Sequence, residues 1–246
     1  MISQAPLELF LIVIGGLTTA FVPVFARAFR IHWTTSLLGC IAWLTVTGAF
    51  PFVLHLMSVG SEAQFPVFAI MLTLAVSLAI GRVGLQVVEM NGLALLAGIH
   101  IFRLPLEFVL ILWYEHGFMP VQMTWNGDNF DVVTGVLALP VAVLIAKKIR
   151  PTLIAFLFNL FGLLMLLNIV LIVALSSPTP LRTLTGGYSS GPETLVGMYF
   201  PSVWIGSVAV VGATFLHIAS LSSLFRKKLA QARSKENRKK FGTLVD

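Results

Sequence analysis

The side chains best placed to do chemistry lie inside apolar segments, where an unpaired charge costs several kcal/mol. His100, Arg103 and Glu107 occur at positions i, i+3 and i+7 of one segment, so they share one helical face. Arg103 and Glu107 are four residues apart and are expected to pair directly. His217, on the last apolar segment, is expected to face the other helices. These four residues predict a polar ligand site, with Arg103 holding an anion or carboxylate and Glu107 or His100 exchanging protons.

The same residues allow two other interpretations. A buried pair of Arg103 and Glu107 would fix the register of the helices without binding any ligand. His100 and His217 fall at similar depth, and a minor alternative is that their imidazoles ligate haem. No other cofactor and no metal site is expected, because Cys40 is the only cysteine. Pro105 lies between Arg103 and Glu107 and predicts a kink, since proline cannot donate the helical hydrogen bond.

The polar segment after Glu107, residues 115–130, is expected to form a roof over this site. Thr124, Asn129 and Asp131 are its candidate binding residues. Asn126-Gly127 predicts a tight turn, because glycine tolerates a positive φ. Asp131 directly precedes an apolar run and is predicted to cap the next helix through its carboxylate.

The stretch from His100 to Gly135 resembles a recurring segment of uncharacterised bacterial integral membrane proteins. In this chain the segment has Arg-x-Pro-x-Glu, followed by Pro-x-x-Met-Thr and Gly-x-Asn-x-Asp. The resemblance points to the residues that match the pattern, which are Arg103, Glu107, Met123, Thr124, Gly127, Asn129 and Asp131. It implies no activity.

The elements that position these residues are predicted to be membrane-spanning helices. Hydrophobic residues make up 57% of the chain and charged residues only 11%, which is too apolar for a soluble domain. A hydrocarbon core of about 30 Å needs about 20 helical residues per crossing. Seven segments approach that length, which predicts an all-α bundle with spans near residues 7–28, 34–57, 65–88, 92–114, 131–149, 152–175 and 200–225. The end of the third span is ambiguous, because Arg82, Gln86 and Glu89 suit either a long tilted helix or an interfacial turn.

The distribution of charge predicts the orientation of this bundle. Fourteen of the sixteen Lys and Arg residues lie between or after alternate apolar runs, while Arg103 and Arg182 are the exceptions. The positive-inside rule makes those regions cytoplasmic, so the N-terminus is expected outside and the C-terminus inside, most naturally in a bacterial inner membrane. Residues 1–225 are then the transmembrane domain and 226–246 a basic tail. The expected partner of the tail is anionic lipid rather than nucleic acid.

These features favour a membrane protein that binds a small molecule in its polar pocket, for sensing or for transport. One alternative is an enzyme that acts on a lipid or quinone, with Glu107, His100 or His217 as acid or base. A second alternative is a structural or assembly protein whose polar residues only specify how its helices pack.

Overall fold

The computed structural model describes residues 4–57, 63–178, 180–185, 192–194 and 199–242, and these residues form helices and their connections without any strand. Five helical stretches are long and apolar enough to cross a membrane, and two shorter apolar helices accompany them. The order is α1 (Gln4–Phe29), α2 (Trp33–Leu56), α3 (Gln64–Ile80), α4 (Arg82–Ile99), η2 (His100–Phe102), α5 (Arg103–Glu115), η3 (Val121–Met123), α6 (Asp131–Ala146), α7 (Pro151–Ser176), α8 (Pro180–Thr185), η4 (Ile205–Val210) and α9 (Val211–Gly242).

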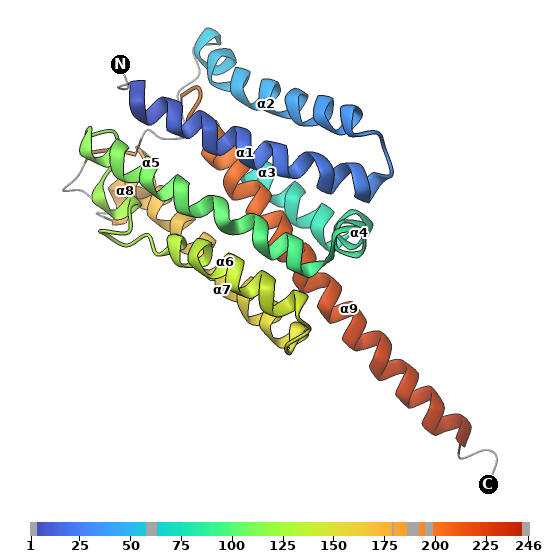
Figure 1. The fold of residues 1–246 in the computed structure, drawn as a ribbon. Helices are drawn as coiled ribbons and strands as arrows, with labels where there is room; N and C mark the ends of the chain where they lie inside the picture. Colours follow the sequence, from blue (N-terminus) through green and yellow to red (C-terminus); the bar gives the residue numbers. More distant parts are fainter. Residues whose placement is uncertain (1–3, 58–62, 179, 186–191, 195–198, 243–246) are drawn as a thin grey trace.

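The long helices run side by side as a bundle, and the two termini lie at opposite ends of it (Figure 1). Helix α9 packs against α3, α4 and α7, and α6 packs against α7. Helix α2 lies along α1 at the edge of the bundle, and many of its large apolar side chains are exposed. A helix this apolar and this exposed is suited to contact with lipid rather than water. Helix α9 continues beyond the bundle, so the start of the basic tail extends the last apolar helix.

The third predicted span is wrong at its end. Helix α3 stops at Ile80, where Gly81 is extended, and the chain then folds back into α4. Gly84 permits this tight turn, because a Cβ there would collide with the backbone of Ala79. Gly92, at φ 77°, divides α4 into two parts. Figure 1 shows a coil of α4 end-on, so the part before Gly92 lies across the bundle axis. This arrangement excludes a single long third helix that continues through residues 82–91.

The distortion expected at Pro105 lies one turn before the proline. Residues His100–Phe102 form the short 3₁₀ helix η2, and regular α-helix resumes at Arg103. Proline has no N–H to donate to the preceding turn, and a tightened turn is one way in which a helix accommodates that loss. Helices α4, η2 and α5 together form one long apolar stretch, from Arg82 to Glu115.

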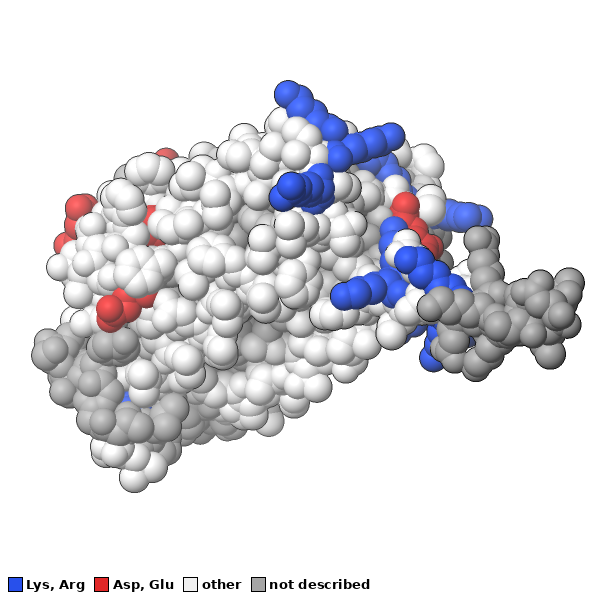
Figure 2. All heavy atoms as spheres, turned by 90° about the horizontal axis from the view of Figure 1, so that it is seen from below, with Lys and Arg blue, Asp and Glu red and all other residues white. Residues whose placement is uncertain are grey.

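Charged side chains gather at the two ends of the bundle and leave a broad uncharged zone between them. Figure 2 shows Lys and Arg gathered at one end of the visible face, with most of the visible Asp and Glu at the other. The basic end includes exposed side chains at the end of α1, the start of α4, the α6–α7 connection and α9, namely Arg27, Arg30, Arg82, Lys147, Lys148, Arg150, Arg226 and Lys227. Glu89, on α4, is an exposed carboxylate seven residues after Arg82. An apolar zone between charged ends is typical of a helical bundle that sits in a bilayer.

Candidate functional site

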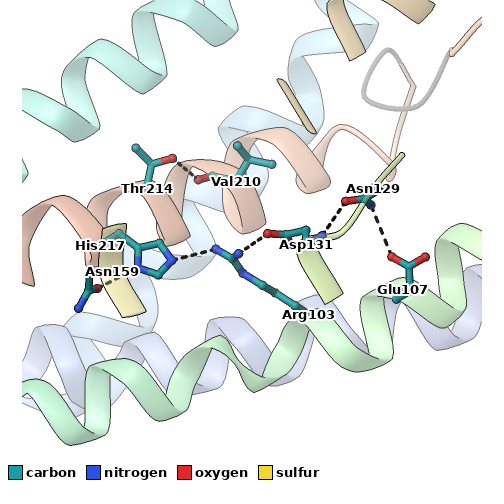
Figure 3. Close-up of polar contacts among 8 residues, drawn as sticks. All are labelled: Arg103, Glu107, Asn129, Asp131, Asn159, Val210, Thr214 and His217. Carbon is teal, nitrogen blue, oxygen red and sulfur yellow. Dashed lines mark hydrogen bonds and ion pairs between the residues drawn. The ribbon is translucent and has the colours of Figure 1, made fainter. Parts of the chain in front are cut away.

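The centre of the site is an ion pair between Arg103 on α5 and Asp131 on α6 (Figure 3). Nη1 of Arg103 donates to Oδ1 of Asp131. The predicted pair of Arg103 with Glu107 is wrong, because the guanidinium points toward α6 and α9 rather than along its own helix. Gly135 allows this approach of α6, since a Cβ there would lie 3.0 Å from the backbone nitrogen of Leu104.

The second terminal nitrogen of Arg103 reaches His217 on α9. Nη2 lies 3.1 Å from Nε2 of His217, and Nδ1 of the same ring lies 2.8 Å from Oδ1 of Asn159 on α7. Arginine can only donate, so Nε2 must accept and the proton of a neutral His217 sits on Nδ1, where it is donated to Asn159. The amide nitrogen of Asn159 donates to the carbonyl of Ala155 at 2.7 Å, which agrees with that orientation. Four helices therefore meet through one arginine and one histidine, both buried.

Gly162 provides the space that His217 occupies. A Cβ at this position of α7 would collide with the imidazole ring. The ring of His217 is fully buried, and it packs against Phe158 as well as Gly162. Close approach of α7 and α9 at this level therefore depends on glycine, as small residues allow between membrane helices.

His100 lies directly against His217, a contact that the sequence did not predict. The two imidazoles are stacked almost in parallel, with 3.9 Å between ring centroids and an angle of 8°. A haem held by two axial histidines needs the rings on opposite sides of the iron, and this arrangement leaves no room for a macrocycle between them. The geometry does not fit a haem ligated by both. Nδ1 of His100 and Nε of Arg103 are buried and have no hydrogen-bond partner.

Glu107 binds the polar connection between α5 and α6. Its Oε1 accepts from the backbone N–H of Trp125 at 2.7 Å, and its Oε2 lies 3.5 Å from Nδ2 of Asn129. Asn129 also donates to the carbonyl of Met123, and its Oδ1 accepts from the backbone N–H of Asp131 at 3.1 Å. Asn129 thus links Glu107 to Asp131, and the connection packs over α5 through these bonds (Figure 3).

Two residues of the connection have structural roles. The hydroxyl of Thr124 donates to the carbonyl of Val121, while its own carbonyl accepts from the N–H groups of Gly127 and Asn129. The expected turn at Asn126-Gly127 is present, but the predicted need for glycine there, a positive φ, is wrong. Gly127 does not have a positive φ, and glycine is needed because a Cβ would crowd the carbonyl of Val121.

Asp131 does not cap α6 as predicted. Phe130 occupies the capping position and its side chain makes no capping hydrogen bond, while the N–H of Asp131 itself donates to Asn129. The carboxylate turns toward Arg103 instead, because a buried guanidinium is a stronger partner than a backbone amide that water or another group can satisfy. The two asparagines of α7 each bond to a separate element: Asn159 contacts His217, and Asn168 donates to the carbonyl of Asp128 at 2.7 Å.

A mostly apolar cavity of about 120 Å³ adjoins this network. Asp131 and Asn129 form part of its wall, together with Ser177 and Ser207. Most of the remaining wall comes from α3, α5, α7 and η4, with Phe50 of α2 and Met123 of η3 contributing as well. It includes Phe68, Met71, Leu106, Leu110, Val170 and Val210. Arg103 and Glu107 contribute no surface to the cavity. Their hydrogen-bond partners, Asp131 and Asn129, line it instead.

The arrangement combines an apolar chamber with a polar wall. Asp131 is already neutralised by Arg103, whereas Glu107 is held only by uncharged donors. Among the described residues, no group of three or more His, Cys, Asp and Glu side chains is placed to hold a metal ion. The chamber suits an organic molecule with an apolar body and a hydrogen-bonding end.

Comparisons with family models, curated proteins and solved structures give no match to this chain. Its site is therefore interpreted from geometry alone, and the resemblance of residues 100–135 to bacterial membrane proteins stays an expectation.

Proposed function

We propose that the protein crosses a bacterial inner membrane seven times, with its N-terminus outside and its basic tail in the cytoplasm. Five long apolar helices support a position in the membrane. The opposite positions of the termini and the gathering of Lys and Arg at one end support an odd number of crossings and this orientation. Helices α3 and α6 are the remaining two crossings.

The lengths of these two helices are compatible with a span. Helix α3 has 17 residues and α6 has 16, near the lower limit of about 17 for a transmembrane helix. Short spans are accommodated when the bilayer thins locally or when flanking residues reach the interface. Lys147 and Lys148 follow α6 directly and are placed to do this.

Within this bundle, we propose that the cavity beside Asp131 binds a small amphipathic molecule for sensing or transport. The observation that carries the proposal is the position of the ion pair: Asp131, which neutralises Arg103, is also a wall of the chamber. A ligand that hydrogen-bonds Asp131 or Asn129 would therefore act on a network that joins α5, α6, α7 and α9. Such a coupling is what a sensor or transporter requires.

The structural alternative has support of its own, because both terminal nitrogens of Arg103 already have protein partners. In that case the network would specify helix packing, and the cavity would carry no ligand. The enzymatic alternative has less support, since Glu107, His100 and His217 are absent from the wall of the cavity.

A fluorescent aromatic amine, 1-aminoanthracene, tests whether the chamber binds amphipathic molecules. The purified protein in lipid nanodiscs is titrated with this probe, and saturable binding is expected. Val170→Phe on α7 places a larger side chain in the cavity wall and should weaken binding at least about tenfold, because filling the space removes it. The matched control is Leu171→Phe, the adjacent residue, whose side chain is exposed on the outside of α7.

The result decides between the two readings. Binding lost in Val170→Phe and retained in Leu171→Phe, with both variants folded, supports a ligand site. Equal binding to both variants, or partition without saturation, would leave only the structural role.

A further inference from the structure

A second hollow lies further along α3, between α2 and the rest of the bundle. It has a volume of about 420 Å³ and an almost wholly apolar lining. Its walls include Phe21, Phe25 and Phe29 of α1, Trp43 of α2, Leu78 of α3 and Phe215 of α9. We refer to it as the α2 groove.

Two tryptophans connect α2 with the segment that precedes α9, and they set one end of the groove. Nε1 of Trp43 donates to the carbonyl of Ser207 in the π-helix η4, and Nε1 of Trp204 donates to the carbonyl of Leu44, both at 3.0 Å. Below these bonds the groove follows α2 back to Ser36 and Thr35. It therefore runs from the level of η4 to the end of α1 and the start of α4, which is the basic end of the bundle.

Arginines flank the groove at the basic end. Arg30 lies between the lining residues Phe29 and Ile31, and Arg82 directly precedes the lining residue Val83. Both arginine side chains are exposed. An apolar channel that ends among exposed cations matches the chemistry of an anionic phospholipid. The acyl chain suits the apolar channel, and the phosphate suits the cations.

The backbone at Arg30 allows its charge to be removed without straining the chain. Arg30 has φ 55°, a conformation that favours glycine. Helix α1 ends there in a Schellman motif, in which Ile31 N–H donates to Ala26 and Arg30 N–H donates to Arg27. Glycine is the usual residue at this position, so replacing the arginine by glycine removes the positive charge and suits the backbone conformation.

We propose that the α2 groove binds one anionic phospholipid, with an acyl chain against the phenylalanines of α1 and the phosphate on Arg30 and Arg82. The lipid fills the space between α2 and α3 that side chains leave open. This site is separate from the cavity beside Asp131, although Met71 and Ser207 line both.

Native mass spectrometry of the purified protein tests the proposal with two probes of equal chain length, dioleoylphosphatidylglycerol and dioleoylphosphatidylcholine. We expect one molecule of the anionic lipid to be retained in preference. Arg30→Gly should reduce that preference about fivefold, the loss of about 1 kcal/mol that one cation near an anionic headgroup contributes. Glycine suits the backbone at this position, so the variant should fold at least as well as the parent.

Lys148→Gly is the matched control. Lys148 has φ 58° and occupies the equivalent position of the Schellman motif that ends α6, but it is remote from the groove lining. Like Arg30→Gly, this substitution removes one positive charge and places glycine at a positive φ. It should leave the preference for the anionic lipid unchanged. If Lys148→Gly reduces retention as much as Arg30→Gly, or if neither does, the groove does not select the lipid.

A second pair of variants tests the apolar part. Gly39 lines the groove and has open space around its Cβ position, whereas Gly16 has open space on α1 but does not line it. Gly39→Phe should abolish retention of the anionic lipid, and Gly16→Phe should not. Three results would each overturn the proposal. The first is retention that Gly39→Phe does not affect, and the second is competition by inorganic phosphate, which would indicate a site for free phosphate. The third is conversion of a dimer to a monomer by Gly39→Phe, which would indicate that a second copy of the chain occupies the groove.

Discussion

The guanidinium of Arg103 pairs with Asp131, which is 28 residues later in the chain, rather than with Glu107 one turn along its own helix. This choice joins α5 to α6 and leaves Glu107 to hold the connection between them through Trp125 and Asn129. Because the two carboxyl groups have different partners, their substitution should have different consequences.

Replacing Asp131 by Asn should destabilise the protein much more than replacing Glu107 by Gln. Asp131→Asn leaves the buried Arg103 without a counter-charge, for which we expect a loss of about 3 kcal/mol. Glu107→Gln keeps an oxygen that can accept from Trp125 N–H, and a loss of about 1 kcal/mol is expected. Unfolding in detergent, followed by circular dichroism, measures both. Equal losses, or a larger loss in Glu107→Gln, would contradict the assignment of partners.

Substitution of Gly162 by Ala should disturb His217 although it changes neither a polar group nor a charge. The added methyl group collides with the imidazole, so the ring must move away from Asn159 and Arg103. We expect a loss of about 2 kcal/mol. Gly98→Ala is the control, because its Cβ would make an ordinary contact at 3.6 Å with Ala142. If both variants unfold alike, the tight contact of α7 with His217 is not present.

Arg103→Lys should not preserve the network although it preserves the charge. A lysine has a single ammonium group, whereas the two terminal nitrogens of Arg103 reach Asp131 and His217 separately. The expected loss is about 1 to 2 kcal/mol, from the bond to His217. A double-mutant cycle with His217→Ala isolates it, since the lysine variant should show little coupling to that substitution. Coupling as strong as that of Arg103 would show that the two contacts are not made by separate nitrogens.

The proposed topology predicts opposite labelling of two engineered cysteines. In a background in which Cys40 is replaced by Ala, Asn126→Cys and Lys148→Cys place single exposed thiols at the two ends of the bundle. A maleimide that does not cross membranes should label Asn126→Cys on spheroplasts, and Lys148→Cys only after permeabilisation. Labelling of both from the same side would contradict a crossing between them.

The positions of the helices along the chain were largely predictable. Long apolar runs and positive charge on one side are requirements of a bilayer environment, so they can be recognised without knowing which residues contact each other. The end of the third span was not predictable. Arg82, Gln86 and Glu89 repeat with helical period, and this period is the same in a span and in a helix that lies at the interface. The difference depends on Gly81 and Gly92, whose backbone angles a list of residues does not reveal.

The sequence singled out residues that belong to the buried polar network, but it did not predict how they pair. Arg103, Glu107, Asp131 and His217 all take part in the network. Spacing of four residues favoured Glu107 as the partner of Arg103, but the distance along a helix does not show which way a guanidinium turns. The role of Gly162 was missed because a single glycine in an apolar helix is common, and only the position of His217 on another helix explains it.

The most direct test of a ligand cavity beside Asp131 is a crystal structure of the protein with a bromine-labelled aromatic amine, read from the anomalous signal of bromine. The proposal predicts a peak enclosed by α3, α5, α7 and η4, with the amine within hydrogen-bonding distance of Asp131 or Asn129. Peaks confined to the lipid-facing surfaces, with the cavity closed by side chains, would contradict it.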